Sequence, residues 1–475
     1  MTPEEFRAAG HQLIDWISDY RSSLDQMPVR AQIEPGDIRK SLPPTPPDQP
    51  IEFEDMLNQL EQRVLPGVTQ VQHPMHFGWF PSNASLASVL GDIASSGLGT
   101  LGISWESCPA LTEVEQVVCD WMRQLTGLSE QWEGTIHDTA STACLTALLI
   151  AREKASNFAQ NRGGLQAEPK AYRVYATREA HSSITKSALL AGFGMDNLQF
   201  VDVDPVNQSM SLAALASCIR QDLTEGHIPT AIIASVGSTG VTAFDPLGPI
   251  TELARQHGIW VHVDAAMAGS AMLLPECRSL WDGVEDADSI SWNPHKWMGT
   301  ILDCSLFYVK DPDLLIQVMS TNPSYLRSSV DSEVTQYRDW GIPLGRRFRA
   351  LKLWFHLSLD GPEAIRMRLR RDIGNAQWFA AEVENTRDWK VLTPVNLQTV
   401  CIRHEPVGMD ADALDQHTLN WVDAINQSGL AFMSPSQLNG RWMVRVSIGV
   451  ESTTREHVKA LWTMIKEQVA LSLQE

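Results

Sequence analysis

Short apolar runs alternate with amphipathic helical runs between residues 85 and 310, and this alternation constrains the fold more than any other feature. The apolar runs, each ending in polar residues, lie at 172–181, 231–240, 258–269 and 288–297. Strands that are apolar throughout and alternate with helices form a mainly parallel sheet with both faces covered. The sequence therefore predicts a large α/β domain. The run 304–311 follows after a short turn, so we expect it to be an antiparallel neighbour.

The segments on either side of this domain have a different pattern. An amphipathic helix with Phe6, Leu13, Ile14 and Ile17 on one face is predicted at the N-terminus, and a proline-rich connector follows it at 42–50. The C-terminal part combines a long helical region, antiparallel strands and a last helix, which indicates a smaller α+β domain. The expected segments are 1–85 (N-terminal helical segment), 86–360 (large domain) and 361–475 (small C-terminal domain).

Composition argues against several classes of function. The formal net charge is −20, without a basic face for nucleic acid or an anionic membrane. The densest basic cluster, 366–371, is interrupted by Met367 and Leu369 at helical spacing, which favours a solvated helix face. No apolar run approaches the roughly 20 residues of a membrane-spanning helix, and the N-terminus lacks the cationic start of a secretory signal. The seven scattered cysteines lack zinc-site spacing, so we expect no metal and a reduced, cytoplasmic protein.

Polar residues follow the predicted strands where ligands bind in open α/β sheets, at the carboxyl ends. These residues are His181, Ser238, Thr239, Asp264, Asn293, His295 and Lys296, and the small residues Ala265 and Ala266 follow Asp264. Ala140 and Ser141 stand at the start of an apolar helical run. Taken alone, each residue could have a structural role instead of a functional one, as a turn-forming aspartate, a structural histidine, a helix cap or a surface lysine. Because all of them meet at one sheet edge, we expect a cofactor site there.

Pyridoxal phosphate suits this set of residues. Lys296 supplies the amine for its aldehyde, and Asp264 can hold the proton of its pyridine nitrogen. His181 and the methyl group of Ala266 can cover the two faces of the ring. The remaining candidates are Ala140 and Ser141 at a helix start for the phosphate, and Asn293 and His295 as further donors. A nicotinamide cofactor fits less well, since no strand is followed by GxGxxG, and no GxxxxGK[ST] loop is present.

Four stretches of the sequence resemble the group II pyridoxal-phosphate decarboxylases, most closely the aromatic-L-amino-acid decarboxylase branch of bacterial DOPA or tryptophan type. They are EAHSS (179–183), HVDAAMAGSA (262–271), NPHKW (293–297) and IPLGRRFRALKLWF (342–355). Lys296 follows Asp264 by 32 residues. The resemblance covers nearly the whole chain. It implies a fold-type I, aspartate-aminotransferase-like architecture and a homodimer with shared active sites, in which residues 1–85 pack on the partner subunit.

The resemblance also implies roles for individual residues. Thr239 matches a residue near the cofactor, and Asp245 one in its supporting network. The substrate pocket would be lined by Trp79, Phe80, Pro81 and Ser82, with Leu101 and Ile103 reaching into the partner's pocket. Tyr337 matches a tyrosine of a mobile loop that supplies or relays a proton to Cα, and without the resemblance it is an ordinary loop aromatic. Arg347 is either functional or part of a structural ion pair.

The expected reaction is therefore decarboxylation of an aromatic L-amino acid to its amine and CO2. The candidates are DOPA, 5-hydroxytryptophan, tryptophan, tyrosine, phenylalanine and also histidine, and Ser82 slightly favours a hydroxylated ring. Aldehyde synthesis and transamination are alternatives with the same cofactor, and Tyr337 argues against aldehyde synthesis. A cofactor-free dimeric binding protein is a further alternative. His181 either binds the substrate carboxylate or assists proton transfer, and His76 either contacts a polar ring or fills space.

Overall fold

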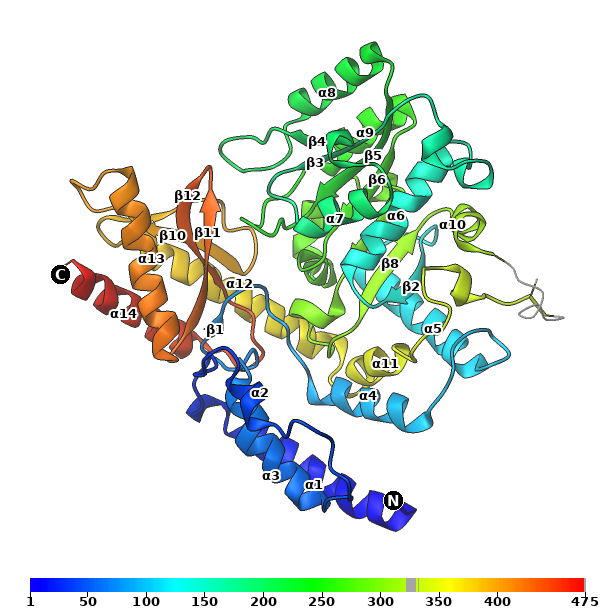
Figure 1. The fold of residues 1–475 in the computed structure, drawn as a ribbon. Helices are drawn as coiled ribbons and strands as arrows, with labels where there is room; N and C mark the ends of the chain where they lie inside the picture. The colour runs from blue at the N-terminus through cyan, green and yellow to red at the C-terminus, as the bar shows by residue number, and fades with distance from the viewer. Residues whose placement is uncertain (322–329, 332, 474–475) are drawn as a thin grey trace. The chain divides into compact units, whose positions relative to one another are not determined.

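The computed structural model describes residues 1–321, 330–331 and 333–473, which form two compact units (Figure 1). The sheet unit comprises 82–376 and 392–399, and the terminal unit comprises 1–81, 377–391 and 400–475. These boundaries at 81 and 376 differ from the expected ones at 85 and 360, and the N-terminal segment groups with the C-terminal strands. Its expected packing on a partner subunit stays a prediction.

The sheet unit contains a seven-stranded sheet of order β2-β8-β7-β6-β5-β3-β4. Its strands are β2 (Glu133–His137), β3 (Tyr172–Thr177), β4 (Leu198–Val201), β5 (Ile228–Ser235), β6 (Trp260–Asp264), β7 (Ser289–Trp292) and β8 (Ser305–Val309). The neighbours from β4 to β7 pair in parallel, whereas β8 is antiparallel to both β7 and β2. The predicted mainly parallel α/β sheet and the antiparallel neighbour at 304–311 are confirmed.

Helices cover both faces of this sheet. The helices of this part of the chain are α4 (Leu86–Leu98), α5 (Pro109–Thr126), α6 (Ala140–Ala155), α7 (Ser182–Leu190), α8 (Leu212–Glu225), α9 (Leu247–His257), α10 (Pro312–Met319), α11 (Ala350–Leu359) and α12 (Pro362–Glu384), the last of which continues into the terminal unit. Successive side chains of a strand point to opposite faces. On β3, Val174 and Ala176 belong to the core cluster that contains α6, whereas the Tyr175 hydroxyl donates to Asp222 on α8. Helices α6 and α8 therefore lie on opposite faces (Figure 1).

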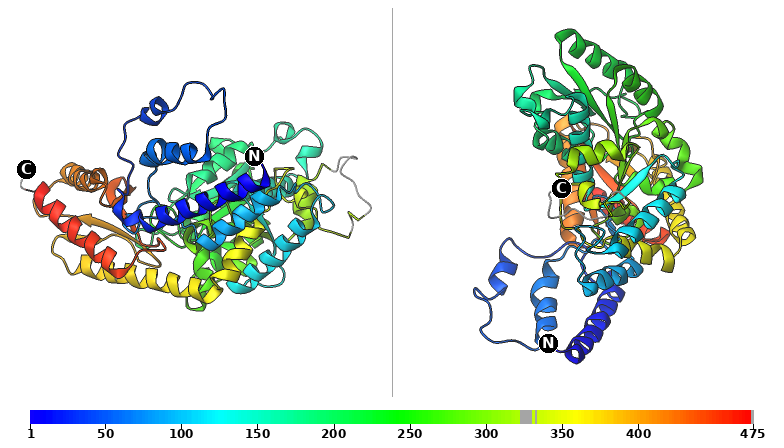
Figure 2. Two further views of the ribbon diagram at one scale, coloured as in Figure 1. Left: turned by 90° about the horizontal axis from the view of Figure 1, so that it is seen from below. Right: turned by 90° about the vertical axis from the view of Figure 1, so that its right-hand side faces the viewer.

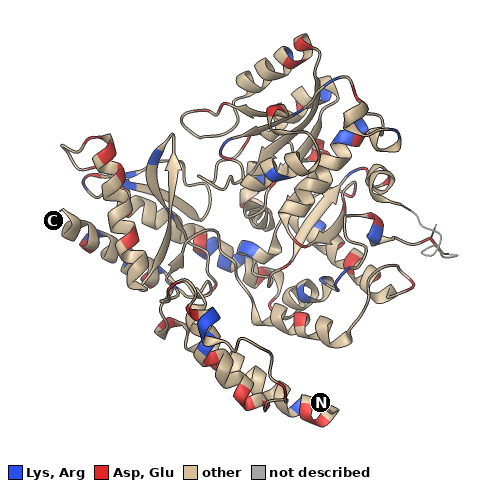
Figure 3. Cartoon of the chain, viewed as in Figure 1, with Lys and Arg blue, Asp and Glu red and all other residues tan. Residues whose placement is uncertain are grey.

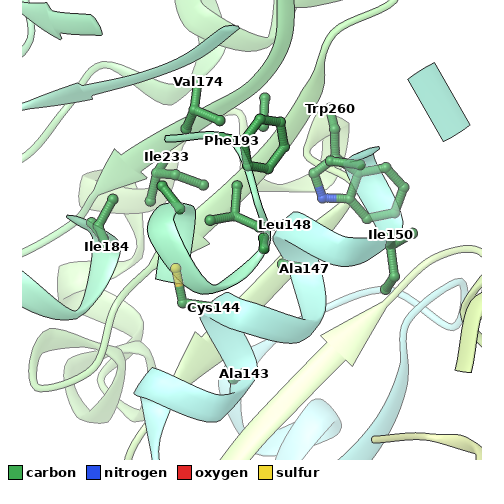
Figure 4. Packing of buried hydrophobic residues seen from close by; sticks show 14 of the residues in the cluster. Ala143, Cys144, Ala147, Leu148, Ile150, Val174, Ile184, Phe193, Ile233 and Trp260 are labelled. Carbon is green, nitrogen blue, oxygen red and sulfur yellow. The ribbon is translucent and has the colours of Figure 1, made fainter. Parts of the chain in front are cut away.

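The main core lies between α6 and the sheet (Figure 4). Ala147 and Leu148 of α6 are fully buried against Ile233 of β5 and Trp260 of β6. Small residues on α6 let the helix approach the strands, and the large aliphatic and aromatic side chains fill the remaining space at native packing density. This packing fixes where α6 begins, and so where Ala140 and Ser141 lie.

The terminal unit is an α+β structure with a five-stranded sheet of order β1-β11-β12-β10-β9. Its elements are α1 (Pro3–Ser22), α2 (Asp37–Ser41), α3 (Phe53–Gln59), β1 (His76–Phe77), β9 (Trp389–Val391), β10 (Thr399–His404), α13 (Ala411–Ser428), β11 (Phe432–Leu438), β12 (Arg441–Ser447) and α14 (Arg455–Ser472). Strand β1 pairs in parallel with β11, which joins the N-terminal segment to the C-terminal sheet. Helix α14 packs on the end of α12, where the rings of Phe379 and Trp462 lie 5.6 Å apart (Figure 2).

Helix α1 has the predicted amphipathic pattern, but none of its residues is buried in the single chain. Its start is fixed by a capping box between Thr2 and Glu5. The apolar face nevertheless leaves Phe6 66% exposed and Ile14 42% exposed. A helix gains most of its stability in proteins from packing such a face, so this face is available to a further surface.

Charged residues of both signs are interspersed over both units (Figure 3). Among the described residues, none of the helices combines the length and the apolar character that crossing a membrane requires.

Six buried histidines predict that acid destabilises the protein. Burial lowers the pKa to about 4 for His76, His137, His262, His295 and His404, and to about 3 for His356. In the unfolded chain a histidine has a pKa near 6.5, so the unfolded state takes up protons first as the pH falls. Stability is therefore fully present above pH 6.5 and is lost toward pH 4. Each histidine costs about 0.7 kcal/mol of unfolding free energy between pH 7 and pH 6.

Urea unfolding of the cofactor-saturated protein at pH 7 and pH 6 measures this effect. Asp245 opposes it, because burial raises its pKa to about 6, and burial raises the pKa of Glu179, Asp288 and Asp372 in the same direction. The variant His262→Asn should lose less stability over this interval than the original chain. An unfolding free energy that is constant or rises on acidification would contradict the prediction.

Candidate active site

The carboxyl ends of four neighbouring parallel strands deliver the residues of the candidate site. In the order β3, β5, β6 and β7, these strands end at Thr177, Ser235, Asp264 and Trp292. His181, Thr239 and Lys296 follow three of these ends within a few residues, and Asp264 is itself the last residue of β6. The sheet therefore brings these sequence-predicted residues to one edge, where open α/β sheets bind ligands.

Lys296 lies in a tight turn directly after β7. The turn spans Pro294–Met298, and Lys296 itself has a non-helical backbone at φ −99° and ψ −118°. Its amide donates to the Asn293 carbonyl at 3.0 Å, and the Gly299 amide donates to the Pro294 carbonyl at 3.0 Å. Gly299 ends the turn at φ +104°, a conformation that favours glycine. The Lys296 side chain is half-buried, so the strand and the turn hold an amine at the edge of the site.

Asp264 and His181 are electrostatically linked to Lys296. The Asp264 side chain is 9% exposed, and one of its oxygens accepts from the Ala266 amide at 3.1 Å. Desolvation lowers the pKa of His181, the Lys296 charge lowers it further, and the Asp264 charge raises it. Both charges act on one imidazole, so the three side chains form one cluster. The His181 residue is otherwise accessible to solvent at the start of α7.

The His181 ring has a defined proton arrangement. Its Nδ1 accepts from the Ser183 amide at 3.1 Å, which caps the start of α7. An accepting Nδ1 in a neutral imidazole leaves the proton on Nε2. His181 is therefore both a helix cap and a donor at Nε2.

The start of α6 provides backbone donors. Thr139 is the N-cap, and Ala140 and Ser141 are the first two residues of the helix. Ser141 is exposed, and Ala140 is half-buried. The first amides of a helix lack partners within the helix and suit a phosphate group.

The remaining predicted cofactor residues are buried or half-buried around the same strand ends. His295 Nδ1 accepts from the Cys304 amide at 2.9 Å, and burial lowers the pKa of His295 to about 4. The ring is thus neutral, with its proton on Nε2. Asp245 accepts from the amides of Met210 at 2.6 Å and Ser235 at 2.7 Å, so it fixes the end of β5. Thr239 is half-buried in the turn after β5.

These residues fit the chemistry of pyridoxal phosphate. They offer an amine, a carboxylate, imidazole donors and helix-start amides at one sheet edge. Asn293 is 3% exposed, and its Oδ1 has no hydrogen-bond partner among the described residues. Such a buried acceptor is costly unless a ligand or water satisfies it. Lys296 would hold the aldehyde of the cofactor, and Asp264 would face its pyridine nitrogen. The start of α6 would hold its phosphate.

Part of the predicted substrate pocket belongs to the terminal unit. Trp79 is 53% exposed at φ +49°, its amide donates to Ser434 Oγ at 2.6 Å, and its ring lies 5.0 Å from that of Phe432. Phe80 is half-buried, with the Arg445 guanidinium 4.8 Å from its ring, and Pro81 is buried.

His76 packs beside the aromatic residues of the pocket segment. It is 2% exposed, with its ring 5.4 Å from Phe432 and 5.5 Å from Trp79. Burial lowers its pKa to about 4. Of the two expected roles, this environment favours packing.

The other predicted substrate residues belong to the sheet unit. Ser82 and Ile103 are half-buried, and Leu101 is 57% exposed. The Ile103 amide donates to Ser107 Oγ at 3.2 Å, which stabilises the loop between α4 and α5.

Tyr337 lies apart from the Lys296 cluster, at the edge of the sheet. It is 5% exposed, and its hydroxyl donates to the Gly134 carbonyl of β2 at 3.2 Å. Burial raises the pKa of its hydroxyl well above the usual value. The predicted lid segment 328–341 includes 328, 329 and 332, which lie outside the described residues. The role of Tyr337 in proton transfer stays a prediction.

Arg347 forms an exposed ion pair with Asp92 at 3.4 Å. Of the two roles expected for Arg347, this contact favours the structural ion pair.

The prediction that residues 366–371 form a solvated helix face is only partly right. Arg370 is 41% exposed and pairs with Glu276, as expected for a solvated face. Arg366 and Arg368, by contrast, are 22% and 11% exposed, and both donate to backbone carbonyls of the sheet unit. The sequence pattern gave only the helical spacing, whereas burial depends on what α12 packs against. The sequence analysis missed Arg368, whose guanidinium reaches the turn that carries Lys296.

Comparisons with known proteins show the family to which the chain belongs. A family model described as the pyridoxal-dependent decarboxylase conserved domain matches residues 35–405. The chain is 39% identical to phenylacetaldehyde synthase of Arabidopsis thaliana, covering 100% of this chain and 97% of the relative. It is 38% identical to tyrosine decarboxylase 2 of Narcissus pseudonarcissus, covering 100% and 95%. A crystal structure of Oryza sativa TDC with PLP and tryptamine superposes with a TM-score of 0.96 at 33% identity, covering 99% of this chain and 98% of that one.

Proposed function

Because the chain belongs to the pyridoxal-dependent decarboxylase family, we propose that it removes the α-carboxylate of an aromatic L-amino acid, with Lys296 binding the pyridoxal phosphate. The observation that carries this proposal is the cluster of Lys296, Asp264 and His181 at one sheet edge. When bound, the cofactor supplies an electron sink for the electron pair that remains on Cα as CO2 leaves.

The chain's own residues prepare this chemistry. The Lys296 amine would hold the cofactor through its aldehyde and would give way to the amine of the substrate. The Asp264 carboxylate stabilises a proton on the pyridine nitrogen, because a negative charge in a largely buried place favours the protonated ring. The start of α6 at Ala140 and Ser141 anchors the phosphate.

His181 has the properties of a donor to the substrate carboxylate. Its lowered pKa keeps the ring neutral, and the capping bond to Ser183 leaves the proton on Nε2. A neutral imidazole donor can orient a carboxylate without strongly stabilising its charge, which would oppose the loss of CO2. We therefore assign His181 to orienting the carboxylate rather than to acid catalysis.

An aromatic substrate is supported by the side chains proposed for the pocket. They are Trp79, Phe80, Pro81, Ser82, Leu101 and Ile103, and they are apolar except for Ser82. The Ser82 hydroxyl slightly favours a hydroxylated ring such as that of DOPA, 5-hydroxytryptophan or tyrosine. The relatives named for phenylacetaldehyde and tyrosine, and the neighbour holding tryptamine, support the aromatic class.

Aldehyde synthesis is the second candidate, since relatives from Arabidopsis thaliana and Petunia hybrida are phenylacetaldehyde synthases. The resemblance assigns Tyr337 to a loop tyrosine of the family, and this assignment would favour simple decarboxylation. A tyrosine at this position would return a proton to Cα, so that the amine is released without oxygen consumption.

A panel of substrates and products tests the function. We expect kcat/KM to be highest for one of DOPA, 5-hydroxytryptophan, tryptophan, tyrosine and phenylalanine, with glutamate at least about 100-fold lower because an acidic side chain loses its hydration in an apolar pocket. CO2 and amine should form in equal amounts, without aldehyde or peroxide. Equimolar aldehyde and peroxide would favour the synthase, and a best activity with glutamate would contradict the pocket.

We further propose a cytoplasmic homodimer with shared active sites. The uncovered apolar face of α1 supports this assembly, as do the exposed Leu86, Leu90 and Ile93 of α4. The odd, scattered set of seven cysteines supports a reducing compartment. Sedimentation of the holoprotein at micromolar concentration should give twice the chain mass of 52.8 kDa. A monomer with full activity would rule the shared site out.

A further inference from the structure

The turn that carries Lys296 rests on side chains of α12. Trp297 and Met298, the two residues after Lys296, are both fully buried. The Trp297 indole Nε1–H donates to the Asp372 carboxylate at 3.0 Å. Arg368 Nη2 donates to the Met298 carbonyl. Two consecutive residues of the turn are thus held by two side chains one helical turn apart on α12.

Asp372 and Arg368 are themselves tied together. Asp372 is fully buried, with Arg371 Nη2 at 2.9 Å from one oxygen and Arg368 Nη1 at 3.9 Å from the other. Burial raises the pKa of Asp372, and the charges of Arg368 and Arg371 oppose this shift. Breaking a buried ion pair leaves an unpaired charge, so this pair is costly to disturb and keeps one arrangement.

The rest of the turn packs against the same group. A Cβ at Gly299 would lie 3.1 Å from Arg368 Nη2 and 3.5 Å from His356 Cε1, so the backbone approaches Arg368 closely. His356 of α11 contacts the residue that follows Gly299, since its Nδ1 lies 2.9 Å from Thr300 Oγ1. Arg370, on the same helix, instead pairs with Glu276 at the surface.

We propose that Arg368 and Asp372 are positioning residues that fix the turn after β7 and thereby the direction in which Lys296 presents its amine. This inference rests on the proposed function, in which Lys296 bonds to the cofactor. The two side chains contact Trp297 and Met298, the residues that follow Lys296, so they act on the turn. Small displacements of a reacting group are costly, so a looser turn should slow the reaction more than it weakens substrate binding.

The test compares the holoenzyme with the variants Arg368→Met, Arg368→Lys and Asp372→Asn. Asp372→Asn retains an acceptor for Trp297 but removes the charge, and Arg368→Lys keeps a donor for the Met298 carbonyl. Arg370→Met is the matched control, an arginine of the same helix that does not contact the turn. The readouts are hydrogen exchange of a peptide containing residues 294–300, the fraction of cofactor trapped on Lys296 by borohydride, and kcat and KM.

We expect Arg368→Met and Asp372→Asn to speed exchange in this peptide by about 10-fold, with a peptide from α8 unchanged. We expect kcat to fall about 10- to 100-fold while KM changes less than about threefold. Arg368→Lys should lie closer to the original chain than Arg368→Met, and Arg370→Met should match the original. Arg368→Lys serves as the conservative variant that restores the donor to the Met298 carbonyl.

Exchange and kcat in Arg368→Met and Asp372→Asn equal to those of Arg370→Met would overturn the positioning role, and Asp372→Asn alone decides it if Arg368→Met does not fold. That result is distinct from failure of the proposed function, in which borohydride would leave Lys296 of the original chain unlabelled. An equal effect on the α8 peptide would also overturn it, since it would indicate a general loss of stability.

Discussion

The variant Lys296→Ala is expected to lower kcat by at least about 10³-fold, because it removes the only amine that the turn after β7 brings to the cluster with Asp264 and His181. Alanine fits the half-buried position without adding volume, so the fold should persist. Steady-state amine production at saturating substrate and cofactor measures the effect.

Lys186→Ala is the control for this variant. Lys186 is exposed on α7, the helix that His181 caps. Its replacement should leave kcat within about twofold, as for most exposed positions. If Lys296→Ala kept more than a tenth of the original kcat, another group would have to bond to the cofactor.

The variant Asp264→Asn is expected to lower kcat by about 10²- to 10³-fold, the usual range for losing one preorganised electrostatic contact in a water-poor site. Asparagine has nearly the same shape, and its Oδ1 can still accept from the Ala266 amide, so the turn after β6 should remain. What is lost is the negative charge that stabilises a protonated pyridine nitrogen. Rates of amine formation with the preferred aromatic substrate measure the loss.

Asp282→Asn is the control, because it makes the same aspartate-to-asparagine change at an exposed position outside the site. It should leave kcat unchanged. Activity of Asp264→Asn within about threefold of the original chain would show that this carboxylate does not tune the cofactor.

Much of the sheet and the strand-end residues could be predicted from the sequence because their signals are local. The runs that became β3, β5, β6 and β7 are rich in apolar residues, and polar residues lie at or just after the end of each strand. Strands β2 and β4 gave no such signal. Strand β4 has only four residues, and β2 begins with the exposed Glu133 and then Gly134. Their places in the sheet depend on pairing with distant segments.

The surroundings of the site could not be predicted from the sequence, because they depend on tertiary contacts. Nothing near Arg368 in the sequence indicates that its guanidinium reaches the Met298 carbonyl, 70 residues earlier. The two-residue strand β1 is too short for a pattern, yet its pairing with β11 groups the N-terminal segment with the C-terminal sheet. Tyr337 could be matched by motif, but its burial against Gly134 could not.

One measurement tests the central claim most directly: reduction of the purified holoenzyme with borohydride, followed by proteolysis and mass spectrometry of the labelled peptide. We predict a single pyridoxyl group on Lys296. A label on another lysine, such as the buried Lys352, or no label on a protein that retains activity, would contradict it.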